Sequence, residues 1–130
     1  MSDVSQNSVQ RLVDRHFNYM RDRVQFDRPE DWRSHADEVE RGDSFNGDCD
    51  DFAMTCAELL TRRGADKSEV GIAFCKTDTG VHHLVCMYKG WILDNRRHWA
   101  VAWDKAGYEW ISVMYLADPG NWMAFAEDYK

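Results

Sequence analysis

The chain has 130 residues, a formal net charge of −7 and an isoelectric point of about 5.1. This balance argues against a nucleic-acid or anionic-membrane partner, because both need clustered Lys and Arg. No apolar run is long enough to span a bilayer, and the polar first ten residues lack the apolar stretch of a secretion signal, so we expect a cytoplasmic location. With 44% hydrophobic residues the chain can build one packed core, and we predict a single domain over residues 1–130.

The first predicted element is an amphipathic helix over residues 7–24, in which apolar side chains recur at helical spacing on one face. A proline break follows, and residues 31–47 form a long polar connection. A short helical turn is expected within it, at residues 36–40. His35, which comes just before this turn, is expected to face solvent.

The segment 47–53, Gly-Asp-Cys-Asp-Asp-Phe-Ala, predicts a loop that turns into a helix. Asp48 is a suitable N-cap, and Asp51 takes the capping-box position that Glu or Gln usually fills. Four apolar side chains then recur at helical spacing, and the helix is expected to end at Gly64 after two arginines. The four apolar residues are Phe52, Cys56, Leu59 and Leu60.

Cys49 lies on the first turn of this helix, where the helix dipole and the free backbone N–H groups favour a thiolate. The neighbouring carboxylates of Asp48, Asp50 and Asp51 oppose a thiolate, so we expect a cationic partner, most simply a histidine, near the sulfur. No Cys-x-x-Cys pair indicates a structural zinc site, and the other three cysteines are predicted to be reduced and buried. They are Cys56, Cys75 and Cys86.

Alternating apolar residues predict strands in the second half of the chain, separated by turn signals. The expected strands cover residues 69–76, 81–88, 91–94, 99–104 and 108–116. The tail over residues 121–130 is expected to form a short turn or helix. Helices that precede strands in this way indicate an α+β fold, with helices packed on a sheet.

The predicted hairpin over residues 81–95 brings a histidine and a carboxylate together. With a two-residue loop at 89–90, the facing pairs are 88 and 91, 87 and 92, 86 and 93, and 85 and 94. This register places His83 and Asp94 on one face of the sheet and His82 on the other. A three-residue loop would shift the register by one residue and favour His82 instead.

Taken in order, these motifs resemble the bacterial transglutaminase-like cysteine peptidases, a family that includes the LapG-type periplasmic proteases. The matching pieces are Asp-Trp at 31–32, G-D-C-[ED]-D-[YF]-A at 47–53, H-[apolar]-V at 83–85 and L-D-N at 93–95. The resemblance covers roughly residues 17–122. Because the chain is short and begins without a secretion signal, the periplasmic role of the LapG-type proteases does not transfer.

The resemblance implies a papain-like transglutaminase core, in which an N-terminal helix and a central Cys-bearing helix pack on an antiparallel sheet. It also implies a catalytic triad of Cys49, His83 and Asp94 that acts on a protein or peptide substrate and requires no cofactor. A calcium site next to the cysteine is a further implication of the family. Its candidate ligands are Asp48, Asp50 and Asp51, although helix capping accounts for two of these without a metal.

Three functions are compatible with these residues. The first is a cysteine-dependent amide hydrolase, most simply a peptidase, in which Cys49 forms a thioester intermediate. His83 accepts the thiol proton and donates it to the leaving amine, and Asp94 fixes the imidazole tautomer. The second is acyl transfer to an amine, as in a transglutaminase, by the same thioester chemistry. The third is a catalytically silent binding module with the same fold. The sequence names neither the substrate nor the oligomeric state.

Overall fold

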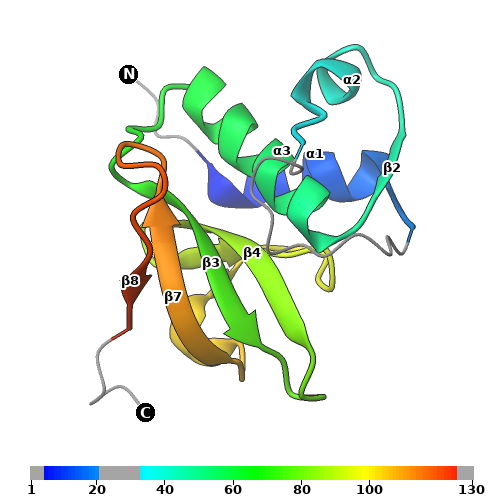
Figure 1. The fold of residues 1–130 in the computed structure, drawn as a ribbon. Coiled ribbons are helices and arrows are strands. Elements are labelled where there is room, and N and C mark those ends of the chain that lie inside the picture. The colour runs from blue at the N-terminus through cyan, green and yellow to red at the C-terminus, as the bar shows by residue number, and fades with distance from the viewer. Residues whose placement is uncertain (1–4, 21–32, 126–130) are drawn as a thin grey trace.

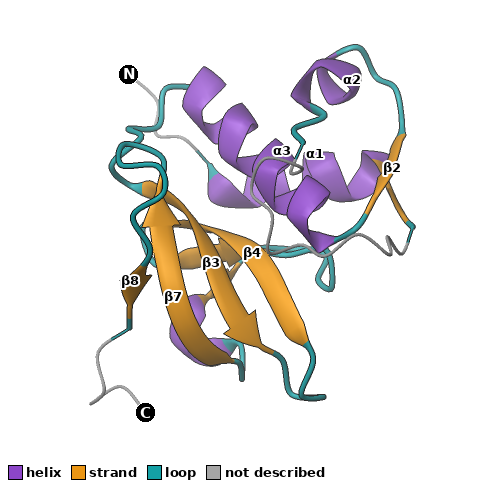
Figure 2. Ribbon diagram, in the orientation of Figure 1, coloured by secondary structure: helices purple, strands orange, loops and turns teal. Residues whose placement is uncertain are grey.

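The computed structural model describes residues 5–20 and 33–125 of the chain. Its three helices lie together on one side of a six-stranded sheet (Figure 1), and colouring by secondary structure separates the two layers (Figure 2). This is the α+β arrangement predicted from the order of helices and strands. No helix within the described ranges is long and apolar enough to cross a membrane.

The N-terminal helix α1 (Gln6–His16) is shorter than the helix predicted over residues 7–24. The chain continues in extended backbone as β1 (Phe17–Tyr19), so the prediction of helix at this point is wrong. The first ring of β1 packs edge-on against Phe52, with 5.0 Å between the ring centroids, and this packing fixes the chain as it leaves the helix. The end of the predicted helix, residues 21–24, lies outside the described residues.

The connection that follows carries two short elements. The helix α2 (Ala36–Glu40) confirms the predicted helical turn, and β2 (Phe45–Gly47) pairs in parallel with β1, which the sequence did not predict. His35 is half-buried rather than exposed as expected. Its ring stacks on Phe45 at 4.6 Å between centroids, and its Nδ1 lies 2.7 Å from Oε2 of Glu38.

The central helix α3 (Cys49–Arg62) crosses the sheet and supplies most of the helical side of the core (Figure 1). Its four predicted apolar side chains are all buried, which confirms the predicted face. A glycine with positive φ, Gly64, follows the helix as predicted. The sheet side chains in the same core are Val70, Ile72, Leu84, Cys86, Tyr88, Leu93 and Met114.

The sheet has the strand order β6-β5-β4-β3-β7-β8, and each neighbouring pair is antiparallel. Its strands are β3 (Val70–Lys76), β4 (His82–Tyr88), β5 (Trp91–Leu93), β6 (Val101–Ala102), β7 (Glu109–Tyr115) and β8 (Met123–Ala124). Four of the five predicted strands are confirmed with shorter bounds. Of the strand predicted over residues 99–104 only residues 101–102 are extended, and a 3₁₀ turn begins at residue 103. The turn or helix expected after residue 121 is wrong, because residues 123–124 pair with β7 instead.

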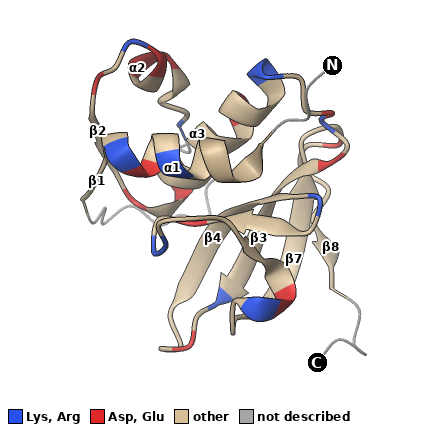
Figure 3. Ribbon diagram, turned by 180° about the vertical axis from the view of Figure 1, so that it is seen from behind, with Lys and Arg blue, Asp and Glu red and all other residues tan. Residues whose placement is uncertain are grey.

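The face of the sheet opposite α3 is covered by the connection between β5 and β7, which includes the 3₁₀ turn η2 (Trp103–Lys105). Side chains from this connection, including Tyr108, build a second apolar cluster on that face. Charge is unevenly placed on the helical layer: acidic residues gather on α2, whereas basic residues mark α1 (Figure 3). The sheet therefore separates two cores.

Candidate active site

Cys49 opens α3, and a capping box fixes the backbone around it. The backbone N–H of Asp48 donates to Oδ2 of Asp51 over 3.2 Å, and the Asp48 side chain accepts from the backbone N–H of Asp51. This confirms the predicted box, with Asp in the usual place of Glu or Gln. Gly47 is required beside it, because a Cβ at that position would lie 2.6 Å from the Cβ of Asp51. The half-buried side chain of Cys49 is thus held at a helix N-terminus.

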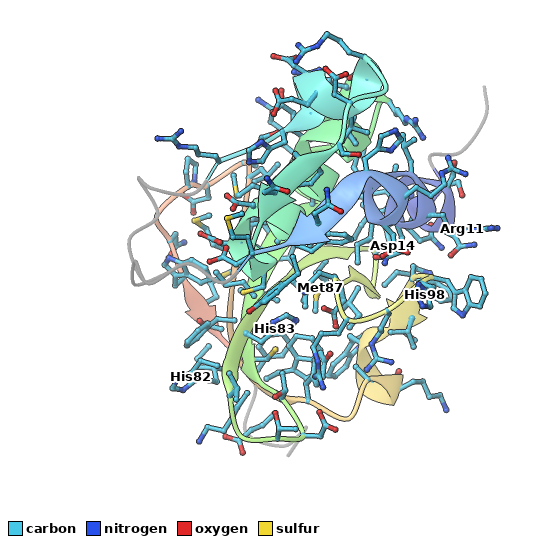
Figure 4. The ribbon with its side chains drawn as sticks, turned by 90° about the vertical axis from the view of Figure 1, so that its right-hand side faces the viewer. Arg11, Asp14, His82, His83, Met87 and His98 are labelled. Carbon is cyan, nitrogen blue, oxygen red and sulfur yellow. The ribbon has the colours of Figure 1, made fainter. Side chains whose placement is uncertain are left out.

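The hairpin of β4 and β5 has the two-residue loop that the sequence predicted. The strands pair at 88 and 91, 87 and 92, and 86 and 93, and both loop residues, Lys89 and Gly90, have positive φ. Beyond the last pair, Nε2 of His83 lies 2.7 Å from Oδ1 of Asp94. Both residues are buried, with 5% and 1% of their surface exposed. His82 leaves β4 on the other side (Figure 4) and is exposed, with its ring stacked on Phe74.

The interaction between Cys49 and His83 appears in the protonation of the imidazole. Burial alone would lower the pKa of His83, but hydrogen bonds donated by the imidazole to the Asp94 carboxylate and to the Cys49 sulfur, with the negative charges of both groups, raise it to about 9. In the described part of the chain β5 stops at Leu93, so β4 has no paired strand on that side at His83. Cys49, at the start of α3, forms a hydrogen bond with this imidazole.

Asp94 is buried at the centre of a hydrogen-bond network. Burial would raise the pKa of this carboxyl, but hydrogen bonds from His83 and Tyr108 and from the backbone N–H of Arg96 hold it below its ordinary value of 3.8. The Tyr108 hydroxyl donates to Oδ2 over 2.5 Å, and Arg96 N donates to Oδ1 over 3.1 Å. Arg97 adds a nearby charge, with its Nε 3.6 Å from Oδ2. The carboxylate is therefore stabilised in its ionised form, as an orienting group for His83 must be.

Gln10 fixes the backbone of the turn that carries Asp94, and the sequence analysis missed it. Its fully buried side chain on α1 donates to the carbonyl oxygens of Asp94 and Arg97 over 2.9 and 2.6 Å. Its Oε1 accepts from the backbone N–H of Asp94 over 2.7 Å. The available signal was a polar uncharged residue beside Val9 on an apolar helix face. Tyr108 was also missed as a site residue, because it was assigned only to a strand.

Three carboxylates flank Cys49 at the start of α3. Side-chain oxygens of Asp48, Asp50 and Asp51 lie within 4.8 Å of one another, and the first two residues are buried. Oδ1 of Asp50 accepts from the backbone N–H of Asp51 over 3.0 Å. Within the residues that the structure describes, this is the one cluster of at least three potential metal-binding side chains.

Comparison with known proteins places the chain in a family. The profile of the family described as bacterial transglutaminase-like cysteine proteinase matches residues 3–130. The chain belongs to this family. No curated protein sequence gives a significant match.

Solved structures give the same fold for this transglutaminase-like proteinase. LapG of Legionella pneumophila superposes with a TM-score of 0.65 at 19% identity, over 93% of this chain and 70% of LapG. The calcium-bound form of LapG superposes with a TM-score of 0.62 at 20% identity, over 84% of this chain and 67% of LapG. The EGTA-treated form superposes with a TM-score of 0.64 at 19% identity, over 90% of this chain and 68% of LapG. At these identities the likeness shows the fold, which confirms the predicted transglutaminase-like core.

The other cysteines of this family member are structural. All three are buried, as the sequence predicted. Burial, together with nearby negative charge, raises the pKa of Cys56 well above its ordinary value and that of Cys75 to about 12, and burial alone raises that of Cys86. These thiols remain protonated at neutral pH, so Cys49 is the accessible thiol of the four.

Proposed function

We propose that the chain is a cysteine-dependent amide hydrolase that acts as a peptidase on protein or peptide substrates. In this proposal Cys49 is the nucleophile, His83 is the general base and then the general acid, and Asp94 orients the imidazole. The observation that carries the proposal is the buried contact of 2.7 Å between His83 and Asp94, next to an accessible cysteine on the first turn of α3. Membership of a cysteine proteinase family supports the same reaction class.

The proposed reaction depends on which nitrogen of the His83 ring faces Asp94 and which faces Cys49. Nε2 of His83 bonds Asp94, so Nδ1 is left to take the proton of the Cys49 thiol. The thiolate adds to the substrate carbonyl carbon, and the C–N bond breaks as the imidazolium donates its proton to the leaving amine. A water molecule, deprotonated by His83, then cleaves the thioester and releases the acid. The backbone N–H of Cys49, at the helix N-terminus, is suited to stabilise the oxyanion in both steps.

Turnover by matched cysteine variants tests the proposal. The purified chain is incubated with an unfolded protein such as reduced casein, and new N-termini are counted by mass spectrometry. Cys49→Ala is expected to lose all cleavage while keeping its unfolding midpoint. Cys56→Ala, which removes a buried thiol from the same helix, is expected to keep cleavage. Equal cleavage by wild type and Cys49→Ala would refute the assignment.

Acyl transfer is the second candidate, since an amine could intercept the same thioester. Including a labelled primary amine in the assay separates the two outcomes. Label that enters glutamine side chains without new N-termini would identify a transglutaminase, whereas new N-termini without label identify a peptidase. Absence of both products, with Cys49 intact, would favour the binding module.

We also propose that Asp48, Asp50 and Asp51 hold a calcium ion. Three carboxylates within 4.8 Å of one another supply the hard oxygen ligands that calcium prefers, and water would complete the coordination shell. A related structure is described as calcium-bound LapG, which supports the proposal. A bound ion would offset the mutual repulsion of the three carboxylates and so stabilise the start of α3. Calcium should raise the thermal midpoint of wild type and of the exposed control Asp104→Asn, but not that of Asp50→Asn; equal shifts in all three would contradict the site.

A further inference from the structure

A pocket of about 350 Å³ lies among the residues that follow Asp94 and the residues around Tyr108. Its lining residues are Asp78, Arg96, Arg97, Ala106, Gly107 and Tyr108. Tyr108 connects the pocket to the site, because its hydroxyl donates to Asp94 and its ring meets the His83 ring edge-on at 5.8 Å. The volume lies at the lower end of the range of ligand-binding pockets, which is roughly 300–1,000 Å³.

Two arginines line the pocket of this acidic protein. Their guanidinium groups meet two carboxylates: that of Asp78, which also lines the pocket, and that of Asp94, whose Oδ2 lies 3.6 Å from Nε of Arg97. Both guanidinium carbons lie over the Tyr108 ring, 5.5 and 5.3 Å from its centroid. Both cations are thus held close to one aromatic ring. Such an arrangement costs little further ordering when an anion binds.

Hydrogen-bond donors remain available on these two side chains. Arg96 donates from Nη1 to the Tyr108 hydroxyl and from Nη2 to Asp78, each over 3.1 Å. The ion pair with Asp78 is exposed and therefore weak and exchangeable. Arg97 donates from Nη2 to the carbonyl oxygen of Ala106 over 2.8 Å, and its Nε is ion-paired with Oδ2 of Asp94 at 3.6 Å. Since each guanidinium has five N–H donors, several are unused.

We propose that this pocket binds a small oxyanion, a carboxylate or phosphate group, between the guanidinium groups of Arg96 and Arg97. Planar guanidinium groups match both kinds of oxyanion geometrically. The bound group replaces Asp78 as the partner of Arg96. The Tyr108 hydroxyl forms hydrogen bonds with both Arg96 and Asp94. An anion bound to Arg96 therefore alters the hydrogen bonding of Asp94, the residue proposed to orient His83. The site is thus a second binding site, separated from Cys49 by the His83–Asp94 pair.

The test is an NMR titration of the full chain at constant ionic strength, with inorganic phosphate in one series and N-acetylaspartate in another. Saturable shifts of the backbone amides of Arg96, Arg97 and Tyr108 are expected with at least one probe. The tighter probe identifies whether free phosphate or a peptide carboxylate is the better ligand. Shifts that grow linearly with both probes, or that spread evenly over all Arg and Lys amides, would overturn the proposal.

Charge-matched variants locate the site. Arg96→Gln and Arg97→Gln are each expected to weaken binding by about tenfold or more, since each removes charge-assisted hydrogen bonds. Arg11→Gln makes the same charge change on the exposed side of α1, far from His83 (Figure 4), and is expected to bind like wild type. Equal weakening in all three variants would overturn the proposal. The readout requires no turnover, so this result is independent of whether Cys49 is a nucleophile.

Discussion

Replacing Asp94 by Asn removes the negative charge beside His83 and keeps the size of the side chain. In the wild type the pKa of His83 is about 9, against an ordinary value of 6.5. At about 1.4 kcal/mol for each pH unit, this difference corresponds to ~3 kcal/mol in favour of the charged imidazole. Burial of the imidazole disfavours its charged form in both proteins, and in the variant only Cys49 still favours the charged form. We therefore expect the pKa of His83 to fall by about two pH units.

The same change has a defined effect on stability. The raised pKa of His83 stabilises the fold fully below about pH 6.5, and this contribution is lost as pH rises through about 9. The lowered pKa of Asp94 contributes above its ordinary value of 3.8 and is lost as pH falls below it. Asp94→Asn should thus lower the free energy of unfolding by ~3 kcal/mol near pH 6, and by clearly less above pH 9.

The assay combines an NMR titration of the histidine rings with urea unfolding at a series of pH values. Asp104→Asn, at an exposed position in η2, is the control for the chemical change and should match wild type. A midpoint for His83 that stays within half a pH unit of the wild-type value would refute the reasoning. So would a destabilisation that is the same at pH 6 and above pH 9.

Three further predictions concern the surroundings of the site. Gly47→Ala should lower the free energy of unfolding by ~1–3 kcal/mol in urea, because its Cβ collides with Asp51, and a loss below the error of the measurement would contradict that packing. Gln10→Leu should lower the free energy of unfolding by ~2–4 kcal/mol, because it leaves buried backbone groups without hydrogen-bond partners. Gln6→Leu on the same helix should change this free energy little, and equal losses in the two variants would contradict the structural role assigned to Gln10. Cleavage should decline as pH rises through about 9, where His83 loses the proton that the leaving amine needs, and a rate that keeps rising to pH 10.5 would argue against His83 as the acid.

Local patterns predicted the parts of the site that depend on neighbouring residues. The capping box follows from the spacing of Asp48 and Asp51, and the two-residue loop at 89–90 sets the register that brings His83 to Asp94. Both rest on interactions over a few residues, which single-sequence patterns describe well. The choice of His83 over His82 depended on a two-residue loop, and the structure contains this loop at Lys89 and Gly90.

Long-range contacts account for what the sequence did not predict. The parallel pairing of β1 with β2 joins segments far apart in the chain, and it overrides the helical pattern of residues 17–19. Gln10 reaches Asp94 across 84 positions, a contact that no periodicity reveals. The half-buried position of His35 depends on stacking against Phe45, which is brought close by β2. The single-domain organisation over residues 1–130 and the cytoplasmic location stay predictions.

The most direct measurement of the central claim is the alkylation rate of each cysteine by iodoacetamide at pH 6, read by mass spectrometry of the digested chain. An imidazolium at His83 should keep the Cys49 sulfur reactive as a thiolate, while the three buried thiols, held protonated, serve as internal controls. We predict that Cys49 reacts at least about tenfold faster than the others in wild type, and that His83→Asn removes most of this advantage. Slow labelling of all four cysteines at one rate, in wild type and variant alike, would contradict the account.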